Sequence, residues 1–250
     1  MTMKYKKNFL THVICKIDFP KLEKYNAETL KTFQQLIKEH FPVIQEIRKI
    51  VIEQTVSEGE STQRKTEDKV YLFRDKTDKE IIQLEPTSII IEYLLYKNFE
   101  EFYESVKLAI ECLFKIYPNI ISTRIGLRYV NHIEIPGDTQ FLKWDGLINS
   151  NLLSSIKFLK VPEKLSQYAG MMELNEDEYT LRFQYGILNS NYPSTLTKKE
   201  FDLDYDYSTK NSIEKVSEIL STIREFNTKI TVIFENSIEK SLREIMGVIE

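Results

Sequence analysis

Hydrophobic and polar residues alternate along several stretches of the chain, as they do in strands that bury one face. The longest stretch covers residues 120–135, where one face is mostly apolar and the other carries Arg124, Arg128 and His132. The same alternation predicts further strands at 10–19, 50–56, 70–74, 81–84, 89–93, 168–174, 179–187 and 201–207. The chain is therefore expected to contain many strands, the longest with a core face and a polar face.

Apolar residues at helical spacing predict three helices, at residues 26–41, 99–117 and 211–246. The last one would span roughly 54 Å at 1.5 Å per residue if unbroken, and a break near Phe226–Thr228 would shorten it. A helix of that length must lie across a whole sheet or extend to a partner. Residues 57–68 are wholly polar, which predicts a mobile hairpin loop.

The order of the predicted elements favours the α+β class with a mostly antiparallel sheet, because runs of hairpin-linked strands stand between the helices. Residues 1–137 fit a ferredoxin-like α+β part. Residues 138–250 fit a three-stranded antiparallel sheet packed by the long C-terminal helix. One continuous domain is the alternative, since 250 residues suit either one large domain or two small ones.

The charge balance and the cysteines limit the function classes that the chain fits. Its 34 Lys and Arg against 38 Asp and Glu give a net charge of −4, which argues against bulk nucleic-acid binding through phosphate contacts. Cys15 and Cys112 form no CxxC motif, and no stretch approaches the roughly 18 apolar residues of a membrane-spanning helix. We therefore expect a cytoplasmic protein with reduced cysteines and no membrane partner.

The usual motifs for nucleotides, cofactors and metals do not occur. The chain has no GxxxxGK[ST], GxGxxG or GxSxG sequence, and its 7 glycines are too few for a phosphate-cradling loop beside ordinary turns. Asp202, Asp204 and Asp206 lack the glycine and glutamate of an EF-hand, and the three histidines show no zinc spacing. We expect no cofactor and no metal ion, which favours a protein that is not an enzyme.

The polar faces of the predicted strands hold the candidate binding residues. Arg124, Arg128 and His132 recur at every fourth position, so they project in one row. Arginine suits a carboxylate or phosphate, and aspartate suits a divalent cation, so these faces suit an anion, a cation or a polar partner. Cross-strand ion pairing on a solvated face explains the same pattern. The candidate set is Arg124, Arg128, His132, Arg182, Asp202, Asp204 and Arg243.

Arg243 differs from the rest because it belongs to the predicted C-terminal helix. It follows Glu239 by four residues, the favourable orientation for an ion pair along a helix. Such a pair would stabilise the helix locally. Alternatively, Arg243 would join a polar cluster that links the helix to the sheet or meets a partner.

Four short motifs are similar to those of one protein family. They are LRYVN at 127–131, FDLD at 201–204, FENSI at 234–238 and LREIMG at 242–247. Through them the chain resembles a sporadically distributed family of uncharacterised bacterial proteins of about this length. The resemblance implies no activity. The patchy distribution of the family implies a role in accessory modules such as defence or toxin–antitoxin systems.

Three functions from different classes follow from these observations. The first is a non-enzymatic binding protein of such a module, which meets a partner protein or a small ligand, or associates with itself, through the C-terminal helix. The second is a nucleic-acid-processing or nucleotide-sensing enzyme that uses Arg128 and His132 with a strand carboxylate. The third is a helix-on-sheet cavity for an apolar ligand, lined by tyrosines. The first is favoured because catalytic motifs are missing and the predicted helix is long.

Overall fold

The computed structural model describes the backbone of residues 4–57 and 60–249, and the side chains of these residues outside 51–64. The chain forms two compact units. The first unit consists of Met1–Val13, Gly126–Lys210 and Ser221–Glu250, and the second of Ile14–Ile125 and Asn211–Leu220. Compactness does not show independent folding, so the expected division into domains at residue 137 stays a prediction.

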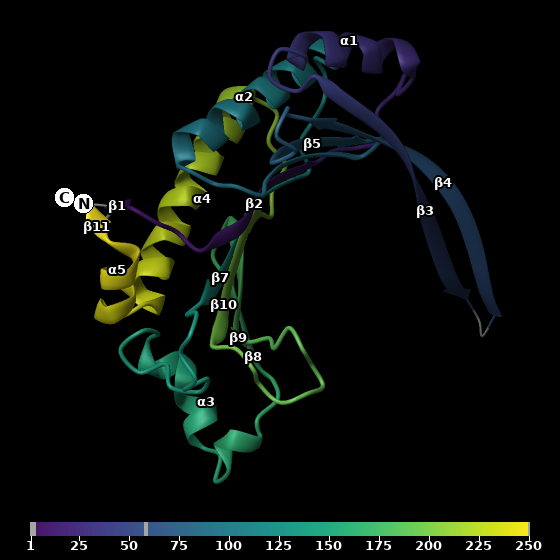
Figure 1. The fold of residues 1–250 in the computed structure, drawn as a ribbon. Helices are drawn as coiled ribbons and strands as arrows, with labels where there is room; N and C mark the ends of the chain where they lie inside the picture. The colour runs from purple at the N-terminus through teal and green to yellow at the C-terminus, as the bar shows by residue number, and fades with distance from the viewer. Residues whose placement is uncertain (1–3, 58–59, 250) are drawn as a thin grey trace. The chain divides into compact units, whose positions relative to one another are not determined.

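The second unit is a meander of strands with two helices packed on one face (Figure 1). Its strands lie in the order β3-β4-β5-β6-β2, and the ladders from β3 to β6 are antiparallel. The ring of Phe33 on the first helix contacts Phe73 on β4, with ring centres 5.3 Å apart. The elements are β2 (Leu10–Asp18), α1 (Ala27–Ile37), β3 (Val43–Ser57), β4 (Glu60–Arg74), β5 (Glu80–Glu85), β6 (Ser88–Tyr93) and α2 (Phe99–Ile116).

The first unit is an antiparallel sheet with a long helix on one face. Its strands lie in the order β7-β10-β9-β8. Phe226 of the long helix stacks on Tyr207 of β10, with ring centres 5.4 Å apart. The elements are β1 (Lys4–Tyr5), β7 (Arg124–Glu134), two 3-10 turns (Ser150–Leu153 and Pro162–Lys164), α3 (Ser154–Lys157), β8 (Tyr168–Asn175), β9 (Tyr179–Ile187), β10 (Glu200–Thr209), α4 (Val216–Ser237), α5 (Lys240–Met246) and β11 (Val248–Ile249).

Local sequence signals explain much of this arrangement. Asn26 begins α1 because its side chain accepts hydrogen bonds from the backbone amides of Glu28 and Thr29. On β7 the alternation places Leu127 and Ile133 in the core, as expected. The α+β class, the mostly antiparallel sheet and the long C-terminal helix are thus confirmed. The ferredoxin-like arrangement of the N-terminal part is not confirmed, because four strands follow one another without an intervening helix.

The polar stretch at residues 57–68 is mostly strand, which corrects the expectation of a loop. β3 ends at Ser57 and β4 begins at Glu60, so residues 58 and 59 are the part of this stretch that lies outside the described chain. The two strands pair over their whole length, but only Tyr71–Arg74 of β4 also pair with β5. The rest of β4 therefore forms a two-stranded ribbon with β3, which leaves the body of the second unit in Figure 1.

The C-terminal helix also differs from the expectation. It begins at Val216 and breaks at Ile238 and Glu239, not near residue 227. Ile230, Ile238 and Leu242 of its apolar stripe are buried, so little of that stripe is left for a partner. No helix in the described part of the chain has the length and apolar character needed to span a membrane.

Candidate functional site

The sheet of the first unit has a face rich in charged side chains, opposite the face that packs on α4. The antiparallel register sets His132 of β7 opposite Asp202 of β10, and Arg128 opposite Asp206. On the other side of β10, Arg182 of β9 is opposite Asp206 as well. The sheet therefore brings together five members of the candidate set, namely Arg128, His132, Arg182, Asp202 and Asp204.

Arg128 is held by Asp204 through a bidentate ion pair. Its Nε donates to Oδ1 at 2.8 Å and its Nη2 donates to Oδ2 at 2.6 Å. The hydrogen bond to Asp204 raises the pKa of the Arg128 guanidinium further above its usual range. Two parallel bonds of this kind fix both side chains in one geometry. The Arg128 guanidinium is thus already bound to a carboxylate of the protein itself.

His132 lies between two carboxylates of β10. Its Nδ1 is 2.9 Å from Oδ1 of Asp202, and its Nε2 is 3.7 Å from Oε2 of Glu200. The hydrogen bond to Asp202 raises the pKa of the imidazole above its ordinary value, while burial opposes this shift, and the charges of Glu200 and Glu134 support it. The arrangement therefore favours the protonated imidazolium in the folded state.

Glu200 is a buried carboxylate that ties a loop to this face. Its Oε1 accepts a hydrogen bond from the backbone amide of Ser190 at 2.7 Å, and its Oε2 is 3.3 Å from the Ser190 hydroxyl. The preceding residue, Asn189, adopts a left-handed conformation and donates to the carbonyls of Ser166 and Ser194. Sequence reasoning missed Ser190, because one serine among many carries no signal before the loop is folded.

Arg182 completes the pattern of paired charges. Its Nη2 donates to Oε2 of Glu173 on β8 at 3.1 Å. Arg128, His132 and Arg182 are therefore each matched to a carboxylate. Glu200 and Asp206 add further carboxylates to this face. An anionic ligand such as a nucleotide would have to displace these partners. The geometry favours the interpretation that this face is stabilised by cross-strand ion pairs.

The other two candidates lie elsewhere. Arg124 is the first residue of β7 but falls within the second unit, where its Nη1 is 3.7 Å from Oδ2 of Asp18. Arg243 of α5 donates from Nε to Oε2 of Glu235 on α4 at 3.0 Å, and Tyr5 donates to the same carboxylate. Arg243 therefore pairs across the break between α4 and α5, which corrects the expected pair with Glu239.

Two surface hollows of the first unit lie apart from the charged residues Arg128 and His132. One of about 380 Å³ is lined by residues 139–143, Glu163, Thr195 and Leu196. Another of about 190 Å³ is lined by residues such as Leu142, Ile156 and Leu159. Neither is lined by Arg128 or His132, so these two hollows give no pocket for the enzyme that would use both residues.

The tyrosines proposed to line a cavity are packing partners. The Tyr205 ring stacks on Phe183 with centres 4.6 Å apart and planes 5° from parallel. Tyr207 is buried as well and stacks on Phe226. Stacked rings fill the space between helix and sheet, as core aromatic residues usually do.

The ribbon of the second unit offers a different kind of surface, which sequence reasoning did not single out. β3 is the first strand in the sheet order, so its outer edge has no neighbouring strand within the described chain. Four apolar side chains along its inner half are well exposed, and Ile50 has an exposed fraction of 55%. They are Val43, Ile44, Ile47 and Ile50.

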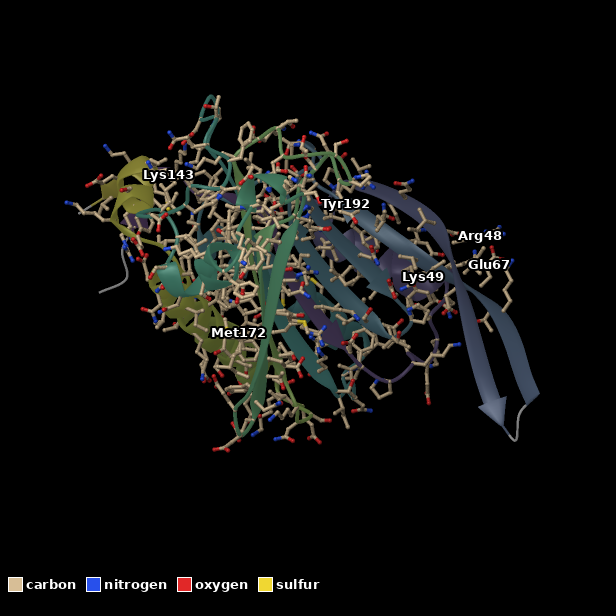
Figure 2. All side chains as sticks on the ribbon, turned by 90° about the horizontal axis from the view of Figure 1, so that it is seen from below. Arg48, Lys49, Glu67, Lys143, Met172 and Tyr192 are labelled. Carbon is tan, nitrogen blue, oxygen red and sulfur yellow. The ribbon has the colours of Figure 1, made fainter. Side chains whose placement is uncertain are left out.

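Charged side chains at the base of the ribbon pair with one another. Arg48 is 3.4 Å from Glu67 on the facing strand, and Lys69 is 3.0 Å from Glu46. Lys49 reaches Glu85 of β5 at 3.0 Å. Figure 2 labels Arg48, Lys49 and Glu67 where the ribbon leaves the body of the unit. With these charges paired, the exposed apolar side chains and the β3 edge, which has no neighbouring strand among the described residues, are open to a partner.

Comparison of the sequence with protein-family models and with curated proteins finds no match.

Proposed function

We propose that the chain is a non-enzymatic protein-binding module that takes up an extended segment of a partner protein along the outer edge of β3. The observation that carries this proposal is the group of exposed apolar side chains between residues 43 and 50 of an edge strand. In the same segment Glu46, Arg48 and Lys49 each have an oppositely charged partner. We place the module in the cytoplasm and in an accessory bacterial system of the defence or toxin–antitoxin type. Buried, unpaired Cys15 and Cys112 support a reducing compartment.

The backbone of β3 supplies the first part of the recognition. An edge strand presents a row of amide and carbonyl groups that a second strand can pair with. A two-stranded hairpin is only marginally stable by itself in water. The ribbon beyond Tyr71 has no third strand within the described chain. An added strand would therefore stabilise the ribbon as well as bind to it.

The side chains supply the second part. Val43 and Ile47 lie on one face of β3, whereas Ile44 and Ile50 lie on the other, since faces alternate along a strand. A strand beside β3 would place its own alternate side chains against both pairs. Because Arg48 and Lys49 already have carboxylate partners, the occupant that fits is an apolar segment without strong charge.

The charged face of the first unit supports the same assignment indirectly. Arg128 and Arg182 would be the natural contacts for phosphate, and both are engaged by carboxylates. An acidic surplus on this face would also repel a polyanion. These features favour protein binding over nucleotide or nucleic-acid chemistry.

The test is a tagged pull-down from the native host, with proteins quantified by mass spectrometry and nucleic acid measured by extraction. The variant Ile47→Lys/Ile50→Lys places two charges on the β3 edge. A control, Leu95→Lys/Val232→Lys, places two charges at two exposed apolar positions elsewhere. We expect one protein at near-stoichiometric yield with the wild type and the control, and a loss of about tenfold or more with the ribbon variant.

Three results would overturn the proposal. One is equal recovery of that protein with the ribbon variant. A second is the absence of any stoichiometric protein. A third is a preparation that carries RNA, DNA or a nucleotide and loses it in Arg128→Ala, which would move the function to the charged face.

A further inference from the structure

The sheet of the first unit ends at β8, an edge strand whose core face is incomplete. β8 is last in the sheet order and pairs with β9 over its whole length. Met172 and Leu174 lie opposite Phe183 and Leu181, which are buried in the core. Yet Met172 is 40% exposed and Leu174 is 47% exposed. Figure 2 labels Met172 on this strand. The apolar face therefore continues to the edge of the sheet and stops there uncovered.

β8 also lacks the devices that usually protect an edge strand. Natural edges are blunted by lysine, proline, bulges or inward-pointing charge. The only charged residue of Tyr168–Asn175 is Glu173, and Arg182 of β9 neutralises it. Its ladder with β9 advances one residue at a time without a bulge. An apolar, regular and unprotected edge of this kind is suited to receive another strand.

We propose that β8 pairs with β8 of a second copy of the chain. The two strands would run antiparallel about a two-fold axis through Met172, so that each Met172 faces its own counterpart. Such an isologous contact is the commonest way in which two identical subunits associate. It would continue the sheet of one copy into the sheet of the other through their β8 edges and cover the exposed part of both core faces. The proposal concerns the first unit only and stands apart from the function proposed for the ribbon.

The residues of β8 are complementary to themselves in this register. Leu174 would face Gly170 of the second copy, so a large side chain meets a position without one. A Cβ atom at Gly170 would lie 2.5 Å from Cζ of Tyr185, so the tyrosine ring covers this glycine and would form the floor beneath the incoming leucine. Glu173 would face Met171 of the second copy. Like charges therefore do not oppose one another, as they would if the axis passed through Glu173.

Single cysteines test the register. Opposed Cα atoms of an antiparallel pair are about 4.5–5.5 Å apart, which is within reach of a disulfide. Met172→Cys should therefore form a covalent dimer under mild oxidation on non-reducing gels. In Leu174→Cys the introduced cysteine of one copy would lie roughly 13 Å from that of the other copy, which is too far for a disulfide. Native Cys15 and Cys112 are buried and serve as an internal background.

Sedimentation velocity tests the association itself. We expect the wild type to form dimers in a concentration-dependent manner. Met172→Lys should weaken the association by about tenfold or more, because two ammonium groups would face each other at the axis. Val232→Lys, at an exposed apolar position on α4, should leave it unchanged, and circular dichroism should show that both variants are folded. A wild-type monomer at all concentrations, equal cross-linking of both cysteine variants, or an unaffected dimer in Met172→Lys would overturn the proposal.

Discussion

Arg128 on β7 and Asp204 on β10 are joined diagonally across their ladder, although Asp206 is the residue directly opposite Arg128. The Arg128 guanidinium thus extends to a residue two positions away from its direct partner on β10, where it forms two parallel hydrogen bonds. Asp204 is the more buried of the two side chains, with 14% of it exposed against 45% for Arg128. The pair therefore neutralises a partly desolvated carboxylate and leaves the rim of the guanidinium in water.

This pair should contribute measurably but modestly to stability. We expect a double-mutant cycle of Arg128→Ala and Asp204→Ala to give a coupling free energy of about 1 kcal/mol, at the upper end for half-exposed pairs because the geometry is bidentate. The measurement is urea denaturation at low and high salt, with a smaller coupling expected at high salt. A coupling free energy near zero at both salt concentrations would show that the pair does not contribute to stability.

The stability of the fold should depend on pH through His132. Since Asp202 raises the pKa of His132 in the folded state, protonation stabilises that state. The contribution is fully present below the ordinary histidine pKa of about 6.5 and is lost as pH rises through the higher folded-state value. Wild type should therefore lose free energy of unfolding relative to His132→Gln over this window, measured by denaturation at successive pH values.

A titration of the imidazole by NMR provides the control for that prediction. In Asp202→Asn the main cause of the shift is removed, so the pKa of His132 should fall toward its ordinary value. If the pKa of His132 in the wild type is at or below about 6.5, the Asp202 carboxylate does not stabilise its protonated form, which contradicts this account.

The apolar stripe of α4 should behave as core. Ile230 is 1% exposed, so Ile230→Ala should lower the free energy of unfolding by about 2–5 kcal/mol. Val232 stands two residues further and is 56% exposed, so Val232→Ala should change it by no more than about 0.5 kcal/mol. Chemical denaturation of both variants checks the difference. Similar effects at the two positions would mean that the helix is not packed by this stripe.

The two cysteines should be inert in the folded protein. Burial raises the pKa of the Cys15 thiol to about 12, and burial also raises that of Cys112. The reactive thiolate is therefore scarce near neutral pH. A thiol-specific colorimetric reagent should label neither residue quickly in native buffer and both in denaturant. Fast native labelling of Cys15 would show that the second unit opens readily.

Periodicity predicted the faces of the strands well, but not which charges would meet. Alternation along β7 puts Asn131 on the same face as Leu127 and Ile133, and it is buried there, where its side-chain amide donates to the carbonyl of Leu203. The diagonal pairing of Arg128 with Asp204 depends on the register between two strands that are distant in sequence. Alternation within one strand carries no information on that register.

The structure differs from the sequence-based expectation at two other places, the β3–β4 ribbon and the break after α4. Both differences have physical causes that the local sequence does not reveal. Residues 60–68 of β4 are a strand because their backbone pairs with β3 residue by residue. Their polar sequence lacks the alternation that marks a strand with one buried face. The helix break after Ser237 arises from tertiary contacts. The carbonyl of Ser237 accepts from the amide of Asn149, and the amide of Glu239 donates to Leu147. A distant segment therefore captures backbone groups that would otherwise continue the helix.

The most direct test of the proposed function is amide hydrogen exchange on the complex isolated from the host. If a partner segment adds to the edge of β3, the amides of residues 43–50 should exchange at least about tenfold more slowly in the complex than in the free chain. The strands of the charged face, including the segment around Arg128, should be little changed. Unchanged exchange along β3, with new protection around Arg128 and His132 instead, would contradict the account and place the binding site on the charged face.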